Sequence, residues 1–234
     1  SMPASDMHGF RNSRPRNVQP AEIKLAVSVA ALTKRPRVAV QAFGGSGWST
    51  TLDDVRRGLN RLAILGVDLP VIQSFHYSMD RAESADDWPN TFFTQNPYWR
   101  HFGELTNYAA RLASLVHHSR AATSIGVLAP LTSVWANTAD GRPNTRAQEV
   151  SDAFEALVDG LFDRRIDVHV VDDTFVVSSK LQGGLLHEGH VKIDTLVVPP
   201  APVISRPVAS RLAAFVKAGG RLVWTGEVPS ASSE

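Results

Sequence analysis

The chain has 234 residues, of which 43% are hydrophobic and 20% are charged, and its formal net charge is +1. This size and composition are typical of a globular protein with its own core, and the balanced charge gives no reason to expect nucleic acid or an anionic membrane as a partner. Because the chain contains no Cys, a disulfide framework, a thiol nucleophile and a Cys-bound zinc ion are all excluded.

The two ends of the chain are expected to lie outside the folded core. Residues 1–18 are polar and lack the apolar stretch of a secretory signal. Nowhere does the chain reach the ~18 consecutive apolar residues that a membrane span needs. We therefore expect a cytoplasmic protein without a membrane partner, with a flexible N-terminal arm over residues 1–18 and a tail over residues 229–234.

A helix and a strand are predicted directly after the arm. Pro20 suits the first position of a helix, and apolar residues then recur at helical spacing as far as residue 34. Val38 to Phe43 is a short apolar run that predicts a buried strand, although it contains the polar Gln41. The strand therefore carries an amide close to the glycine-rich turn that follows it.

A second helix and strand are predicted between residues 49 and 75. Ser49 to Thr51 offer N-cap side chains, two acidic residues follow in the first turn, and Gly66 suits the C-cap. Val67 to Phe75 predicts a strand, but Pro70 excludes it from the centre of a fully paired sheet. A long loop follows over residues 78–95, and loops of this length inside a domain are often functional.

The rest of the chain alternates between helices and strands, which predicts an α/β fold with mostly parallel strands. We place a domain boundary near Ala122, with two β/α units over residues 19–121 and a small doubly wound sheet over residues 122–228. The expected helices are 96–118, 148–162 and 206–218, and the expected strands are 125–129, 168–171, 195–198 and 221–224.

Polar and aromatic side chains gather where the first two predicted strands end. Glycine lets the backbone approach a ligand closely, and Trp48 can stack on a sugar ring or pack as a lid on the next helix. The candidates for a direct role in chemistry are Gln41 and His76, and the candidates for ligand binding are Gly45, Trp48, Gln73, Tyr77 and Asp80. The alternative is a tight structural turn followed by a solvated acidic loop with a half-buried His.

Other motifs do not point to a metal or a cofactor, and we predict neither. The HEGH segment, His187 to His190, has the wrong spacing for a zinc helix and reads as an exposed turn. The GGSGW segment is neither a phosphate loop nor a nucleophile elbow. Asp172 and Asp173 follow a predicted strand, where they would either line a ligand crevice or form a turn.

Four segments resemble the late part of large glycoside hydrolases, above all the α-L-rhamnosidase-like proteins and the β-galactosidases with a flavodoxin-like domain. The segments are VAVQAFGGSGW, GVDLPVIQSFHYSMD, FFTQNPYWRHFGELTNYAARLASLV and IGVLAPLTSVWA. The resemblance implies that residues 38–43 and 67–75 are the last two strands of a (β/α)₈ barrel and that a flavodoxin-like domain follows. It also implies a sugar site at the carboxyl ends of these strands.

Two departures from the family pattern bear on activity. The family has Glu at the position of Gln41 and often His at the position of Gln73, and six earlier barrel strands have no counterpart here. Glycoside hydrolysis requires two carboxyl groups, and an amide is neither a base nor a nucleophile at neutral pH. We therefore predict a shortened, hydrolysis-deficient relative that binds a glycoside or a sugar-like ligand.

Whether the chain is an enzyme stays open at this point. The alternative function is a non-enzymatic scaffold or interaction protein, or an enzyme of another class that reuses the barrel remnant. Two isolated β/α units would expose strand edges, which proteins must cover. We expect the two N-terminal strands to join the C-terminal sheet or to pair with another chain, most simply in a homo-oligomer.

Overall fold

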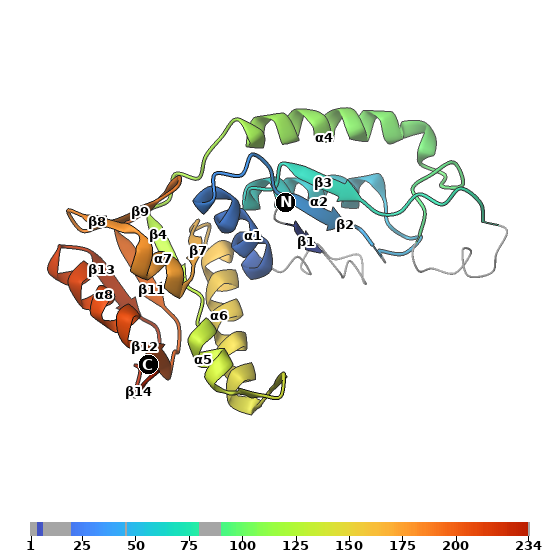
Figure 1. Ribbon diagram of the computed structural model, residues 1–234. Coiled ribbons are helices and arrows are strands. Elements are labelled where there is room, and N and C mark those ends of the chain that lie inside the picture. The colour runs from blue at the N-terminus through green and yellow to red at the C-terminus, as the bar shows by residue number, and fades with distance from the viewer. Residues whose placement is uncertain (1–3, 7–19, 45, 80–89, 234) are drawn as a thin grey trace. The chain divides into compact units, whose positions relative to one another are not determined.

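The computed structural model describes residues 4–6, 20–44, 46–79 and 90–233. By its internal contacts the chain divides into two compact units, shown in Figure 1. The N-terminal unit comprises Ser1–Ala30 and Arg35–Arg120, and the C-terminal unit comprises Ala31–Lys34 and Ala121–Glu234. Among the described helices, none has the length and apolar character needed to cross a membrane.

The N-terminal unit contains a parallel three-stranded sheet in the order β1–β2–β3. Its strands are β1 (Ala4–Asp6), β2 (Ala39–Ala42) and β3 (Leu69–Ile72). The strand β3 lies at an edge of this sheet, in agreement with the exclusion of Pro70 from a central position. The two N-terminal strands that we predicted therefore belong to a sheet with β1, and they do not join the four-stranded sheet of the C-terminal unit.

The strand β1 lies in the segment that the sequence analysis described as an arm, so the unit has three parallel strands where two were expected. The sequence Ala-Ser-Asp has no hydrophobic periodicity that would mark a strand. The segment is a strand because it pairs with β2, with Asp6 opposite Gln41, and this pairing supplies its backbone hydrogen bonds.

Three helices accompany this sheet: α1 (Pro20–Leu32), α2 (Leu52–Leu65) and α4 (Phe102–His117). The predicted ends of α2 are confirmed, because Thr51 and Asp54 form a reciprocal capping box and Gly66 adopts a φ of 100° at the C-cap. The helix α4 begins later than predicted. Asn96 accepts a hydrogen bond from the Tyr98 amide and so forms a turn, and a 3₁₀ segment (Trp99–His101) precedes the helix.

Burial alternates along β2 and positions the candidate site. Val40 and Ala42 are fully buried, whereas Ala39 and Gln41 are partly exposed. Because successive side chains of a strand point to opposite faces, Gln41 projects from the face opposite to Val40. Helix residues of α1 and α2, including Ile23, Val55, Leu59 and Leu62, are buried as well.

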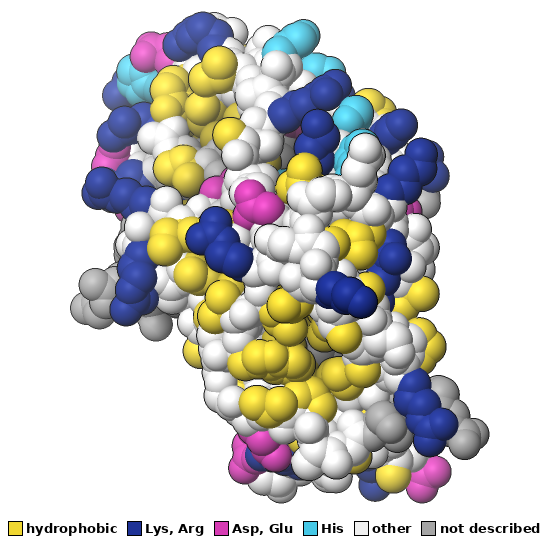
Figure 2. Space-filling view, turned by 90° about the vertical axis from the view of Figure 1, so that its left-hand side faces the viewer, with side chains coloured by type: hydrophobic (Ala, Val, Ile, Leu, Met, Phe, Trp, Pro, Cys, Tyr) yellow, Lys and Arg dark blue, Asp and Glu magenta, His cyan; other side chains and the backbone are white. Residues whose placement is uncertain are grey.

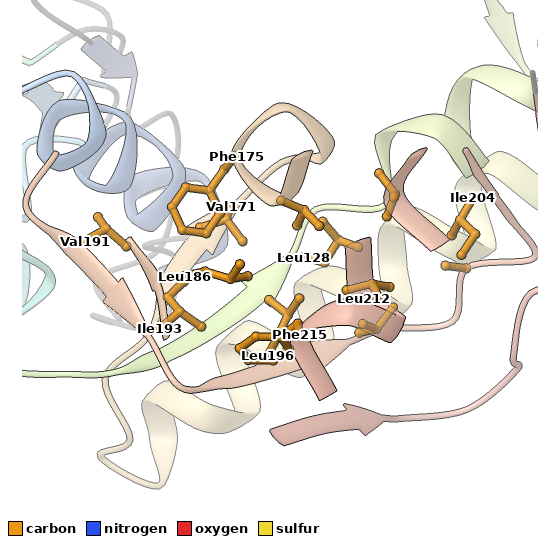
Figure 3. Packing of buried hydrophobic residues seen from close by; sticks show 14 residues of the cluster. Leu128, Val171, Phe175, Leu186, Val191, Ile193, Leu196, Ile204, Leu212 and Phe215 are labelled. Atoms are coloured by element: carbon orange, nitrogen blue, oxygen red, sulfur yellow. The ribbon is translucent and has the colours of Figure 1, made fainter. Parts of the chain in front are cut away.

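The C-terminal unit contains a parallel four-stranded sheet in the order β13–β11–β4–β7. Its strands are β4 (Ile125–Leu128), β7 (His169–Val171), β11 (Thr195–Val198) and β13 (Arg221–Trp224), and its helices are α5 (Leu131–Ala136), α6 (Thr145–Asp163), α7 (Asp173–Ser178) and α8 (Arg206–Lys217). Figure 3 shows Phe175, Leu186, Leu196 and Phe215 converging from α7, β9, β11 and α8 in the core. The strand–helix alternation predicted from the sequence is thus present, and the fold class is α/β with parallel sheets.

The short helices α5 and α7 of this unit were not predicted, and between the predicted strand 168–171 and Gly189 only a turn or short strand region was expected. The small strands are β5 (Thr138–Ala139), β6 (Arg142–Pro143), β8 (Lys180–Gln182), β9 (Leu185–Glu188), β10 (Val191–Ile193), β12 (Val203–Ser205) and β14 (Ala231–Ser233). The strand β14 pairs with β12, so part of the predicted tail is ordered by a partner 28 residues away in the chain (Val203 opposite Ala231). Strands this short carry too few residues for a periodic signal.

Candidate functional site

The candidate site lies at the carboxyl ends of β2 and β3. The backbone ladder between these strands continues beyond β3, because the Gln73 amide donates to the Ala42 carbonyl at 2.9 Å. This continuation brings the side chains of Gln41 and Gln73 into contact, and Gln41 Nε2 donates to Gln73 Oε1. Among the described residues the pair makes no further side-chain hydrogen bond, which leaves Gln41 Oε1 and Gln73 Nε2 without a side-chain partner there.

Glycine at position 44 makes room for this pair of amides. A Cβ atom on Gly44 would lie 2.5 Å from Gln73 Oε1, a distance that is far below van der Waals contact. The preceding residue, Phe43, is fully buried and adopts a φ of 70°. Glycine at this position therefore lets the backbone pass close to the side chain of Gln73.

A second group of polar side chains links the loops after β2 and β3. Ser46 Oγ donates to Asn90 Oδ1 at 3.1 Å, and Ser74 Oγ donates to the Asn90 carbonyl at 2.9 Å. His76 Nε2 lies 3.0 Å from Ser74 Oγ, and the His76 amide donates to Thr91 Oγ1 at 3.0 Å. Asn90 is only 1% exposed and thus connects both loops from a buried position.

The hydrogen bonds of Ser74 determine which group donates in its contact with His76. A hydroxyl has one hydrogen, and that of Ser74 is directed at the Asn90 carbonyl. Ser74 Oγ therefore accepts from His76, which must carry a hydrogen on Nε2. This is the reverse of an activated serine, in which the histidine accepts the serine proton, so the geometry argues against Ser74 as a nucleophile.

The remaining candidates are separated from these contacts or cannot be placed. Trp48 is half-buried after β2, whereas Tyr77 is 94% exposed after β3. Gly45 and Asp80 lie outside the described residues. The structure thus brings Gln41 and Gln73 together and places His76 in the network with Ser74.

Four polar residues of the network were not singled out from the sequence: Ser46, Ser74, Asn90 and Thr91. Asn90 and Thr91 are buried polar residues at the end of a long loop, where a sequence pattern predicts exposure. An aromatic cluster lies nearby in the chain, and Trp99 stacks on Phe102 with 5.7 Å between ring centroids. Phe102 is buried at 7% exposure, whereas Trp99 is 37% exposed, so of these two rings only Phe102 belongs to the core.

The acidic pair Asp172 and Asp173 has a structural role. Asp172 caps α7 by accepting from the Phe175 amide at 2.8 Å. Burial is the main cause that raises the pKa of Asp173, whose carboxylate accepts a hydrogen bond from Thr132. The capping contact explains Asp172 without a ligand.

The HEGH segment forms the turn between β9 and β10. His187 and Glu188 end β9, and Gly189 has a φ of 60° at the turn. Within the described ranges, no three His, Asp or Glu side chains come together as metal ligands.

The α/β architecture of the chain is similar to that of three glycoside hydrolases of known structure. A rhamnosidase from Novosphingobium sp. PP1Y matches with a TM-score of 0.67 and 17% identity, over 98% of this chain and 21% of that chain. A GH42 β-galactosidase from G. stearothermophilus matches with a TM-score of 0.58 and 14% identity, over 94% and 32%. A β-galactosidase from Rahnella sp. R3 matches with a TM-score of 0.52 and 19% identity, over 94% and 32%.

These matches confirm, at the level of the fold, the resemblance to glycoside hydrolases that the sequence motifs indicated. The chain spans about a fifth to a third of the length of these three structures. No protein-family model matches the chain, and a search of curated proteins finds no relative.

Proposed function

We propose that this chain is a carbohydrate-binding relative of the glycoside hydrolases that does not hydrolyse its ligand. In this proposal the N-terminal unit is a remnant of a (β/α) barrel and the C-terminal unit is a flavodoxin-like domain. The parallel β1–β2–β3 sheet and the parallel β13–β11–β4–β7 sheet support the two assignments. The similarity to a rhamnosidase and to β-galactosidases suggests deoxyhexose and hexose glycosides as the ligands to test.

The observation that carries the proposal is the contact between the amides of Gln41 and Gln73. It lies at the carboxyl ends of parallel strands, the edge at which barrel and open α/β folds bind ligands. The pair has one carbonyl oxygen and one NH₂ group outside this contact, which favours a ligand that both donates and accepts hydrogen bonds. Neighbouring hydroxyl groups of a sugar have this property.

The same contact supports the absence of hydrolysis. In each retaining or inverting mechanism, one carboxyl group donates a proton and a second carboxylate attacks or activates water. The family that the sequence motifs resemble has Glu at the position of Gln41, and the amide found here remains neutral at physiological pH. The chain also spans too little of its fold relatives to supply a whole barrel.

The experiment is a titration of the chain with methyl rhamnoside and with methyl galactoside, in which binding is measured by calorimetry or by NMR chemical-shift changes. We expect saturable binding to one of the two glycosides. Gln41→Ala should weaken it by about five- to tenfold, the value of one hydrogen bond of about 1 kcal/mol. The matched control is Gln182→Ala. Gln182 is an exposed residue at the end of strand β8, so its substitution should leave the affinity unchanged.

A parallel assay measures hydrolysis of nitrophenyl rhamnoside and galactoside. We expect no turnover by the wild type or by Gln41→Glu, because one restored carboxylate still lacks its partner. Turnover by the wild type would contradict the loss of hydrolysis. Absence of binding to both glycosides in the wild type and in Gln41→Glu would contradict the carbohydrate site itself.

A further inference from the structure

The strand β13 is an edge strand of the sheet in the C-terminal unit. Its inner side pairs with β11, and within the described part of the chain no strand pairs with its outer side. The strand contains neither Pro nor an acidic residue, and Val223 in its middle is 43% exposed. Apart from its short length and the charge of Arg221, the strand therefore lacks the features by which proteins block an unpaired edge.

The hydrogen bonds of β13 show which backbone groups face outward. The amides of Arg221 and Thr225 donate to carbonyls on the β11 side, to Asp194 at 2.8 Å and to Val198 at 3.0 Å. In a parallel ladder the backbone N–H and C=O groups of successive residues point alternately to the two sides of the strand. Those of Val223 therefore also face β11. The N–H and C=O groups of Leu222 and Trp224 consequently point away from the sheet.

An apolar hollow lies beside this edge. It has a volume of about 590 Å³ and includes one charged residue, Lys217, in its lining. Figure 2 shows hydrophobic side chains gathered around a hollow in the lower half of the face that α8 and β13 present. The lining residues that the argument uses are Ala209, Ala213 and Val216 on α8 and Leu222 and Trp224 on β13.

We propose that this surface is the interface between two copies of the chain. In the proposed dimer the two β13 strands pair in antiparallel orientation, with Val223 on the two-fold axis. A second copy is the occupant that the edge favours, because the same residues supply both the unpaired backbone groups and the apolar lining. Such self-complementary surfaces form isologous dimers.

This register satisfies every outward backbone group of β13. Leu222 of each copy pairs with Trp224 of the partner subunit, and each of these two pairs exchanges two N–H···O bonds. The result is four hydrogen bonds and one continuous eight-stranded sheet. Val223 and Val223 of the partner subunit form the pair without mutual hydrogen bonds, in which Cα atoms are about 4.5 Å apart.

The side chains are compatible with this register. Leu222 and Trp224 both line the hollow, so each packs on the same face as its cross-strand neighbour. The small side chains of Ala209 and Ala213 allow the α8 helices of the two copies to approach closely. Arg221 and its symmetry mate are separated by four residue positions, roughly 14 Å along the strands, so their charges do not oppose each other directly.

The first test is the mass of the chain in solution, by light scattering coupled to gel filtration. We expect twice the 25.4 kDa of one chain at the highest soluble concentration. Val223→Lys should give a monomer, because two like charges would meet on the axis. Val71→Lys is the matched control: Val71 is 47% exposed on β3, an edge strand of the other sheet, and this variant should remain dimeric.

A monomeric wild type would overturn the proposal. A dimer that survives Val223→Lys but is lost in Val71→Lys would overturn it as well, in favour of association through the β1–β3 sheet. Circular dichroism of both variants shows whether a change in mass reflects the interface or unfolding.

A second test uses the absence of Cys from the chain. In Val223→Cys the two thiols would meet on the axis at a Cα separation that a disulfide accepts, so mild oxidation should give a covalent dimer. Val177→Cys, at a similarly exposed valine on α7 (44%), should stay uncrosslinked under the same conditions. Equal crosslinking of both variants, or none in Val223→Cys, would contradict the proposed register.

Discussion

Asp68 joins the start of β3 to the last residue of α4 through His117. Asp68 Oδ2 lies 2.7 Å from His117 Nδ1, and Asp68 Oδ1 accepts the Val38 amide at 2.8 Å. Both oxygens of a buried carboxylate are therefore used, one by a helix and one by the segment that enters β2. A single side chain thus holds three elements of the N-terminal unit at the end opposite to the candidate site.

We expect Asp68→Ala to lower the free energy of unfolding by about 2–3 kcal/mol. The substitution leaves the Val38 amide buried without its charged acceptor, and such hydrogen bonds are the costly ones to lose. Urea denaturation measures the change. The control is Asp152→Ala, which removes an exposed carboxylate bonded to Gln148 and should change stability by less than about 0.5 kcal/mol. Equal effects of the two substitutions would show that Asp68 is not an anchor.

Gly44→Ala tests whether the amide pair is the binding site. The new Cβ would lie 2.5 Å from Gln73 Oε1, so the Gln73 side chain must move away from Gln41. We expect glycoside affinity to fall by about five- to tenfold, as for the loss of one hydrogen bond. Gly103→Ala adds a Cβ that meets no atom within 4 Å, and it should leave affinity unchanged. If Gly44→Ala binds as the wild type does, the ligand does not depend on this contact.

The pKa of Asp194 predicts a dependence of stability on pH. The hydrogen bonds from Thr195 and Ser124 hold this pKa below its usual value of 3.8. Because the pKa is lower in the folded state than in the unfolded state, the ionised carboxylate stabilises the fold at pH values above the unfolded-state pKa. This contribution is lost as the pH falls through the folded-state pKa. Asp194→Asn should therefore be less stable than the wild type near neutral pH. The difference should shrink below pH 3.8, as urea denaturation at several pH values would show; a constant difference would contradict the assignment.

Local signals in the sequence predicted the elements whose ends depend on near neighbours. The capping box of Thr51 and Asp54 involves residues three positions apart, and Gly66 follows directly after α2. Such contacts form within one turn of helix, so the order of residues is enough to predict them. The strands β1 and β14 were missed because each depends on a partner strand far away in the chain.

The candidate site was predicted in part, for the same reason. Gln41 stood out as a polar residue in an apolar run and Gln73 through the resemblance to the glycoside hydrolases, and the structure places the two side chains in contact. Asn90 was missed, because its importance comes from hydrogen bonds to Ser46 and Ser74 across 44 and 16 positions of the chain. Nothing in the composition of its own loop distinguishes it from a solvated Asn.

The sequence by itself determined the alternation of strands and helices, the caps of α2 and the presence of an amide in β2. These properties follow from hydrophobic periodicity and from contacts within a few residues. Only the tertiary structure decided that Gln41 meets Gln73, that His76 lies against Ser74, and that β13 is the last strand of its sheet among the described residues. The physical reason is that strand order and register bring together residues that are distant in the chain, and no local pattern specifies which strands become neighbours.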